Sequence, residues 1–277
     1  MENQVRYVDL GLVSPEVHVG IWEYQHIVEI EQPTLIRWSL EKETATFFGI
    51  YPTDLTHILE KLEDKIRTFD ATILVEDNWR ETPNENIAFY LEGPQITNIT
   101  LFSKLEPDKT LDLLIDTVSK ECGKYGIETK QSGRNDTLFK IDGKWKKAIG
   151  NGKISVFDWV ETSVAISYSL HTDLANKIRD LDYKKTLKSM YLRDEEVDNL
   201  KFEGDVSDVI GGLLEKNPNI NQKEFDSNVI NSFIKKLNLK ITEDKISKSE
   251  HEKLWLRGHQ RLTDKDWVEK GINKFDI

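Results

Sequence analysis

The stretch GRNDTLFKIDGKWKKAIGNGK, residues 133–153, decides the fold, because it contains two strand patterns joined by a tight turn. Asp142-Gly143 is a dipeptide that favours the two-residue turn of a β-hairpin, and the residues on either side have strand character. Five lysines fall within fourteen residues here, although the chain has a formal net charge of −11. This lysine-rich hairpin is therefore either a solvated face or a site that holds an anion.

A turn at Asp142-Gly143 also determines which hairpin side chains share a face, since cross-strand partners point the same way. One face is predicted to carry Thr137, Phe139, Ile141, Lys144, Lys146 and Ala148, and the other Asp136, Leu138, Lys140, Trp145, Lys147 and Ile149. Lys147 thus shares its face with apolar side chains, where a lysine must extend to solvent, form an ion pair or hold a buried anion. A slip of one residue would exchange the two faces.

Along the rest of the chain, strand and helix patterns mix up to His171, and helical patterns dominate beyond it. Strands are expected at 6–10, 34–40, 44–50, 67–77, 86–93, 96–104, 153–160 and 162–170. Helices are expected at 14–30, 53–66, 107–126, 171–181, 205–216, 222–237, 247–258 and 263–274. We predict an α+β fold of mixed and antiparallel sheets flanked by helices, with a main domain at 1–190 and a helical C-terminal segment at 191–277 packed on it.

Composition excludes several classes of function. A pI near 5.2 argues against a general nucleic-acid binder, which needs a basic surface. The single cysteine, Cys122, permits no disulfide within the chain and no Cys-rich zinc site, and its place in an amphipathic helix favours a core position. No apolar run is long enough to span a membrane, and no signal peptide is visible, so we expect a cytoplasmic protein.

Two short motifs resemble known sites but fail on inspection. GNGK at 150–153 lacks the glycine and the hydroxyl residue that a phosphate-binding loop requires, because Lys147 and Ile154 stand there. HEKLW at 251–255 lacks the second histidine of a zinc-protease helix. The lysine-rich hairpin therefore remains the main functional candidate.

The segment GRNDTLFKIDGKWKKAIG (133–150) resembles that of lipoate–protein ligases and related octanoyl transferases, in which an Asn-Asp pair precedes a hairpin with one catalytic lysine. Weaker similarity extends over 6–23, 162–178 and 249–271. The resemblance implies the biotin/lipoate ligase fold. It also implies ATP and Mg²⁺ as cofactors, and lipoate or octanoate as the acid joined to a lysine of a lipoyl carrier domain. Such a carrier would be a 2-oxoacid dehydrogenase subunit or the glycine cleavage H protein, with no nucleic acid or membrane partner.

The same resemblance assigns roles to individual residues. Lys147 would bond the acyl carbonyl and the phosphate oxygens, Asn135 would donate to the adenylate, and Asp136 would place Mg²⁺ or the lysine. Gly150 completes this half of the expected site. Because Gln131 and Ser132 stand where the cysteine-dependent transferases carry their nucleophile, the resemblance favours a lysine-based reaction.

The other half of the family's site, an Arg-Arg-x-Gly-Gly-Gly loop, is altered. Gap-free alignment matches Arg67 to its first arginine and puts Asp70, Ala71 and Thr72 at its three glycines. Side chains there would fill space in which a ligand packs against bare backbone. Three interpretations therefore stay open: an acyl ligase or transferase, a non-catalytic relative that binds a ligand or a protein, and a plain solvated hairpin.

Overall fold

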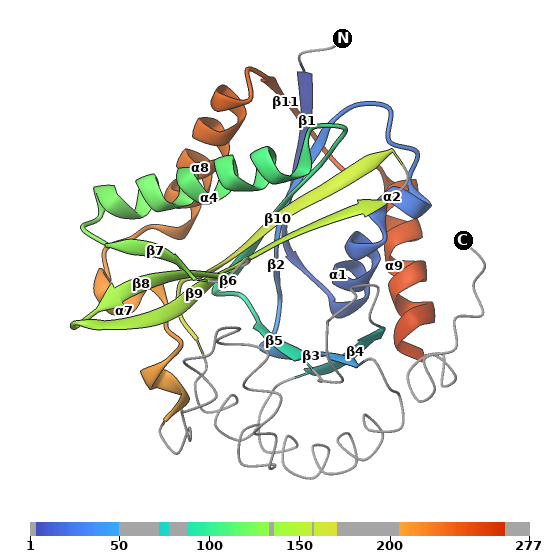
Figure 1. Ribbon diagram of the computed structural model, residues 1–277. Helices are drawn as coiled ribbons and strands as arrows, with labels where there is room; N and C mark the ends of the chain where they lie inside the picture. Colours follow the sequence, from blue (N-terminus) through green and yellow to red (C-terminus); the bar gives the residue numbers. More distant parts are fainter. Residues whose placement is uncertain are drawn as a thin grey trace.

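The computed structural model describes residues 4–49, 72–77, 88–132, 136–156, 158–170 and 205–263. Its main element is an eight-stranded sheet in the order β11-β1-β2-β6-β10-β9-β8-β7 (Figure 1). These strands are β1 (Gln4–Val13), β2 (Thr34–Leu40), β6 (Ile96–Ser103), β7 (Thr129–Ser132), β8 (Asp136–Ile141), β9 (Lys144–Val156), β10 (Trp159–Ser167) and β11 (Lys240–Asp244). β1 is parallel to β2 and β11, and the other neighbours are antiparallel. The predicted mixed sheet is thus confirmed.

A smaller sheet and several helices complete the described part of the fold. The sheet has the order β4-β3-β5 and consists of β3 (Thr44–Gly49), β4 (Thr72–Asp77) and β5 (Ala88–Glu92). The helices are α1 (Pro15–Trp22), α2 (Tyr24–Ile27), α4 (Pro107–Lys124), α7 (Leu213–Lys216), α8 (Gln222–Lys236) and α9 (Lys248–Thr263), with a 3₁₀ turn at Val206–Asp208. None of the helices within these ranges is long and apolar enough to cross a membrane.

Local sequence signals account for several of these elements. Ser14 caps α1 by accepting a hydrogen bond from the Val17 N–H, and Pro15 occupies the first helical turn, as predicted. The hairpin turn is also confirmed, because Asp142 and Gly143 have φ values of 47° and 83°. Two successive residues with positive φ define the turn type that matches the twist of paired strands.

Three expectations for secondary structure were wrong. The C-terminal part contains a strand, β11, whose pairing with β1 outweighs the helical pattern around it. Residues 205–216 are not one continuous helix, because the 3₁₀ turn at Val206–Asp208 and α7 are separated by residues 209–212, where Ile210 forms a bridge with the hairpin. Residues 153–160 are not a separate strand, because β9 continues to Val156 and β10 begins at Trp159.

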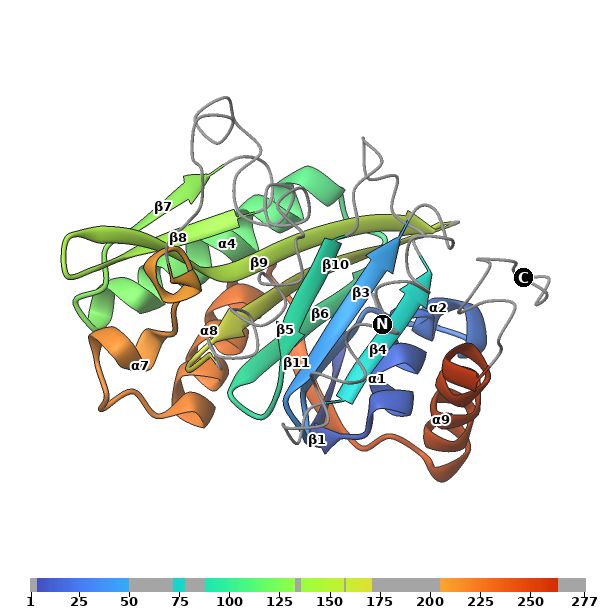
Figure 2. The same ribbon diagram turned by 90° about the horizontal axis from the view of Figure 1, so that it is seen from below.

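Helices cover the two faces of the large sheet in different places (Figures 1 and 2). α4 and α8 pack on one face, where their apolar side chains join those of β1, β2, β6, β8, β9 and β10 in the larger core. On the opposite face α1 and α9 cover β1, β2 and β6 through a second apolar cluster. The two helices cross at glycines: a Cβ on Gly20 would collide with the Leu254 carbonyl, and one on Gly258 with that of Glu16. The candidate site lies on this second face, beyond the strands that α1 and α9 cover.

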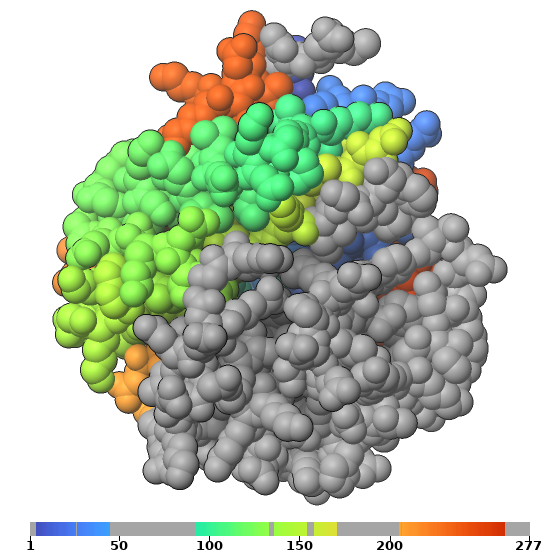
Figure 3. All heavy atoms as spheres, viewed as in Figure 1, coloured from blue at the N-terminus to red at the C-terminus, as the bar shows by residue number. Residues whose placement is uncertain are grey.

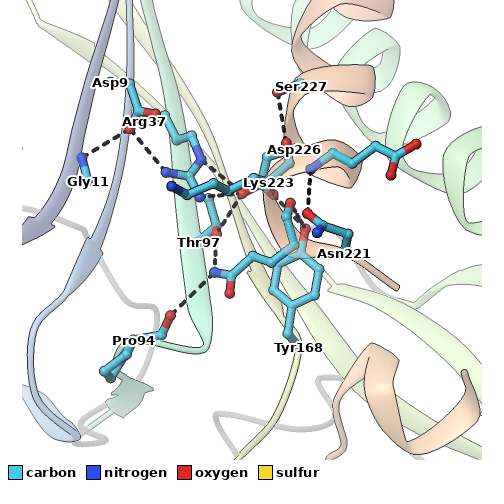
Figure 4. Close-up of polar contacts among 12 residues, drawn as sticks. Asp9, Gly11, Arg37, Pro94, Thr97, Tyr168, Asn221, Lys223, Asp226 and Ser227 are labelled. Carbon is cyan, nitrogen blue, oxygen red and sulfur yellow. Dashed lines mark hydrogen bonds and ion pairs between the residues drawn. The ribbon is translucent and has the colours of Figure 1, made fainter. Parts of the chain in front are cut away.

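A buried ion pair fixes α8 to the sheet (Figure 4). Nε and Nη2 of Arg37 on β2 donate to Oδ2 of Asp226 on α8 at 2.8 and 2.6 Å. Thr97 donates to the same oxygen at 3.0 Å, and the Tyr168 hydroxyl donates to Oδ1 at 2.5 Å. Each charged group is therefore paired and hydrogen-bonded, which a buried ion pair requires. The network connects β2, β6 and the end of β10 to one helix.

Candidate functional site

The lysine-rich hairpin joins β8 to β9, and its register contains a bulge. Leu138 pairs with Lys147, but Thr137 pairs with Ile149, so Ala148 is the extra residue. The predicted faces are confirmed between the turn and Lys147. The prediction for Ile149 was wrong, because the bulge turns this side chain into the core beside Phe139. Lys147 therefore points away from α4 and α8, toward the open part of the second face.

Every lysine of this hairpin has a carboxylate partner. The pairs are Lys140 with Glu128 at 3.1 Å, Lys144 with Asp208 at 2.7 Å, Lys146 with Glu215 at 2.8 Å, Lys147 with Asp136 at 2.8 Å, and Lys153 with Asp108. Figure 3 shows the hairpin, in yellow-green, at the surface beside α4. The lysine charges of the hairpin are thus neutralised from within the protein, so the hairpin is not a general anion-binding surface. The pair of functional interest is Lys147–Asp136, because both of its side chains are mostly buried.

The Lys147–Asp136 pair is held from both main chain and side chain. The Lys147 and Asp136 side chains are only 18% and 17% exposed. The Lys147 N–H donates to the Val209 carbonyl at 2.8 Å, and its carbonyl accepts from the Gly211 N–H at 3.0 Å. The segment 209–211 therefore continues the sheet beside β9 where β10 has ended. This clamp fixes the position from which the lysine side chain extends.

Small side chains lead across the sheet from this pair. Register places Asp136, Gly150, Ala165, Asn98 and Trp38 in one row over β8, β9, β10, β6 and β2, all on the same face. A Cβ on Gly150 would meet no atom of the described residues within 4 Å. The row, which we call the transverse row, thus begins at an ion pair and passes two small residues, Gly150 and Ala165, before it reaches the buried Asn98 and Trp38.

The transverse row ends at a tightly held indole. Nε1 of Trp38 donates to Nδ1 of His18 on α1 at 3.0 Å, and Trp38 is 2% exposed. His18 is fully buried, and burial lowers its pKa to about 3, so the ring is uncharged at neutral pH. An uncharged ring can accept this hydrogen bond on an unprotonated nitrogen.

The structure brings together three of the predicted site residues, Asp136, Lys147 and Gly150. Asn135, Arg67, Asp70 and Ala71 lie outside the described residues. Thr72, expected in a ligand loop, begins β4 and pairs with Thr44 on β3.

Among the described residues of this site, a metal ion would have one carboxylate ligand, Asp136. Within the described ranges, no group of three or more His, Cys, Asp or Glu side chains converges to form a metal site. Mg²⁺, however, usually takes one or two carboxylates and completes its shell with phosphate oxygens and water. Asp136, a single carboxylate beside Lys147, fits that habit when a phosphate-bearing substrate is present.

Sequence reasoning missed two parts of the site. The first is the clamp at 209–211, for which the Gly211-Gly212 pair was a signal: a Cβ on Gly212 would collide with the Tyr168 carbonyl. The second is Asn98, a buried amide in a strand that alternates polar and apolar residues. Cys122 was correctly expected in the core, where burial raises the pKa of its thiol to about 12.

Comparison with solved structures reveals the architecture. The chain is similar to the bi-partite lipoate protein ligase of Thermoplasma acidophilum, with a TM-score of 0.67 and 12% identity over 100% of both chains. It also matches lipoate-protein ligase A bound with ATP (TM-score 0.61, 12% identity, 97% of this chain and 99% of that one). A third match is P. falciparum LipL1 in complex with lipoate (0.58, 16%, 99% and 76%).

The chain therefore has the lipoate–protein ligase fold, which confirms the predicted fold class and the resemblance in architecture. No protein-family model matches the sequence, and no curated protein matches it either. At these identities the similarity establishes the fold, and activity has to be argued from the site itself.

Proposed function

We propose that this protein is an acyl ligase that activates lipoate or octanoate with ATP and transfers the acyl group to a lysine of a lipoyl carrier domain. The observation that carries the proposal is the mostly buried Lys147–Asp136 pair beside Gly150, where an added Cβ would meet no atom of the described residues within 4 Å. A plain solvated hairpin accounts for the exposed Lys140 and Lys144, and Lys146 pairs with Glu215 on the other face, but neither gives a reason for the Lys147–Asp136 pair to face the transverse row.

The reaction has two steps, and the same residues serve both. In the first, a carboxylate oxygen of the acid attacks the α-phosphorus of ATP, and pyrophosphate leaves. In the second, the uncharged amine of the carrier lysine attacks the acyl carbon, AMP leaves, and the amine loses one proton to solvent. Lys147 would donate hydrogen bonds to the oxygens that gain charge in these steps.

Asp136 has two roles in this proposal. Its Oδ1, 2.8 Å from Nζ of Lys147, holds the ammonium group in place. Asp136 would also hold Mg²⁺, which neutralises phosphate charge when bound. Asn135 would donate to the adenylate, and Gly150 leaves room for it. Arg67, Asp70, Ala71 and Thr72 remain proposed contacts on the far side of the ligand.

The matched solved structures support the choice of ligands. One is a ligase bound with ATP, another is in complex with lipoate, and a third was studied with its E2 lipoyl domain. A 2-oxoacid dehydrogenase subunit or the glycine cleavage H protein would present such a domain to this chain in the cytoplasm.

The test is intact-mass analysis of a lipoyl carrier domain incubated with the protein, ATP, Mg²⁺ and either lipoate or octanoate. We expect the mass of one acyl group to be added by the wild type and by Lys144→Ala, and none by Lys147→Ala. Lys144 is the matched control, because it is a paired lysine of the same hairpin on the other face. Equal activity of Lys147→Ala would refute the role of this residue.

A second candidate function is a non-catalytic relative that binds a ligand or a protein. The observation in its favour is that Asp70, Ala71 and Thr72 stand where the family's glycines are expected, and Thr72 begins a paired strand. If no acid is transferred with any carrier while an acid still binds, this candidate replaces the first.

A further inference from the structure

The clamp is attached to the hairpin by one carboxylate, that of Glu215 on α7. Oε2 of Glu215 accepts from Nζ of Lys146 at 2.8 Å, and Oε1 accepts from the Gly212 N–H at 2.8 Å. The Lys146 side chain is 13% exposed, and that of Glu215 is 36% exposed. The clamp lies close to this pair, because a Cβ on Gly211 would come within 2.9 Å of Glu215 Oε1 and 3.0 Å of Lys146 Cδ. The Lys146–Glu215 ion pair therefore joins the clamp to the residue next to Lys147.

The clamp lies beside the bulge of β9. Lys147 bonds to the clamp through both its N–H and its carbonyl, and it comes directly before the extra residue Ala148. Ile210 of the clamp forms a parallel bridge with Lys147 and is buried. Two main-chain hydrogen bonds and a buried side chain thus hold the backbone at the point where the register changes. A bulge at such a point re-aims the side chains that follow it.

The bulge decides which side chain lies beside the Lys147–Asp136 pair. In the bulged register Asp136 pairs with Gly150, and Ile149 faces the core. Without the bulge, the register at the turn would continue along the strands, and Asp136 would pair with Ile149 instead. Because cross-strand partners share a face, an isoleucine side chain would then occupy the position at which Gly150 has none. The bulged register is therefore the one that leaves room beside the pair.

We propose that Glu215 and Lys146 are positioning residues of the acyl-transfer site, which hold the clamp on β9 and thereby keep this strand in its bulged register. The inference rests on the proposed function and adds two residues that act through the main chain of Lys147. When the ion pair is lost, a fraction of the molecules adopts the regular register, in which Ile149 obstructs the acid. Since the acid binds only the bulged molecules, its apparent affinity falls with their fraction, whereas molecules that have bound it react at the normal rate.

The kinetics of carrier acylation by the full chain test this role. Glu215→Ala and Lys146→Met should each raise the KM for the acid that the wild type transfers, lipoate or octanoate, by about threefold to tenfold, with kcat at saturating acid unchanged. Lys146→Arg keeps the charge and should have the wild-type KM. Lys144→Ala is the matched control, because it breaks the neighbouring ion pair with Asp208, whose two side chains are 63% and 49% exposed. This control should also have the wild-type KM.

Hydrogen exchange followed by mass spectrometry measures the clamp without turnover. The Lys147 and Gly211 amides, which form the hydrogen bonds between β9 and the clamp, should exchange faster in Glu215→Ala than in the wild type or Lys144→Ala. The amides of α8 should keep their wild-type exchange rates, because the clamp opens locally while the rest of the fold stays intact.

The outcomes separate this inference from the proposed function. A raised KM together with faster exchange at the clamp supports the inference. A wild-type KM in both Glu215→Ala and Lys146→Met, or wild-type exchange at both clamp amides, overturns it while the proposed function stands. A lower kcat with unchanged KM and a lower thermal midpoint also overturns it, because that result indicates only a loss of folded protein. If the wild type transfers no acid to any carrier, the proposed function itself fails, and the positioning role fails with it.

Discussion

The charge state of His18 gives a prediction whose sign and size both follow from the structure. His18 is fully buried between two indoles: Trp38 Nε1 donates to Nδ1 at 3.0 Å, and Trp22 Nε1 lies 3.0 Å from Nε2. An uncharged ring accepts on only one of its nitrogens, so with Nδ1 accepting from Trp38 the proton lies on Nε2, beside Glu92. Burial lowers the pKa from 6.5 to about 3. The Glu92 carboxylate, 3.0 Å from Nε2, acts in the opposite direction. We expect the ring to stay uncharged in the folded protein, because an imidazolium would place its Nδ1–H against the N–H of Trp38.

The consequence for stability can be calculated. Because the folded-state pKa is lower than the unfolded one, the contribution is fully present above pH 6.5 and is lost as the pH falls from 6.5 toward 3. pH 5 lies about 1.5 units below the pKa of His18 in the unfolded state, and this difference corresponds to about 2 kcal/mol of unfolding free energy. The free energy of unfolding should therefore decrease by about 2 kcal/mol between pH 7 and pH 5 through this residue alone.

The assay is urea unfolding at pH 7 and pH 5, followed by tryptophan fluorescence. The decrease should be present in the wild type and in His259→Gln, where a half-buried histidine stacks on Trp255 in the wild type, and absent in His18→Gln, which can still accept from Trp38. A wild type that becomes more stable toward pH 5 through His18 would refute the reasoning. It would mean that the ion pair with Glu92 outweighs burial and the indole contacts.

Three further predictions concern the packing of α9 and the core. Gly258→Ala should destabilise the protein by several kcal/mol, because the added methyl collides with the Glu16 carbonyl; thermal unfolding of this variant beside an Ala substitution at exposed Glu252 on α9 would measure the difference. Burial raises the pKa of Glu250, but hydrogen bonds from Arg6 and Ser247 outweigh it and lower the pKa to about 2, so wild type should lose stability as the pH falls from 4.5 toward 2. Solvent screening limits this loss to about 1 kcal/mol, and Glu250→Gln should not show it. The measurement is the urea midpoint at a series of acid pH values; midpoints that fall equally in the wild type and the variant would contradict the prediction. The Cys122 thiol should react with iodoacetamide only after unfolding, since it is buried and burial raises its pKa to about 12; rapid labelling of the native protein, read by mass, would contradict its core position.

The sequence determined the hairpin well because its signals are local. Asp142-Gly143 defines the turn, the turn sets the register, and the register placed Lys147 on the face of Asp136. The bulge at Ala148 has no such signal, since nothing in a Lys-Ala-Ile run indicates an extra residue. It follows from contacts that the hairpin makes with 209–211, far along the chain.

The transverse row could not be predicted for a related reason. Asn98 and Gly150 are separated by many residues and become neighbours only through the strand order β6-β10-β9. β11 was missed because an edge strand with three charged residues carries no apolar alternation, and its pairing with β1 decides its conformation. Local patterns thus predicted the position of Lys147, whereas its neighbours in the transverse row could be identified only from the assembled sheet.

Alternation along the strands links the stability of the sheet to its site. Arg37 points into the buried network under α8, and the next residue, Trp38, closes the transverse row on the other face. Thr97 and Asn98 repeat this division on β6. The ion pair with Asp226 therefore fixes the two strands whose opposite sides form the floor of the site. Paired groups on the α8 face thus hold in place the strands that carry Trp38 and Asn98 on the site face.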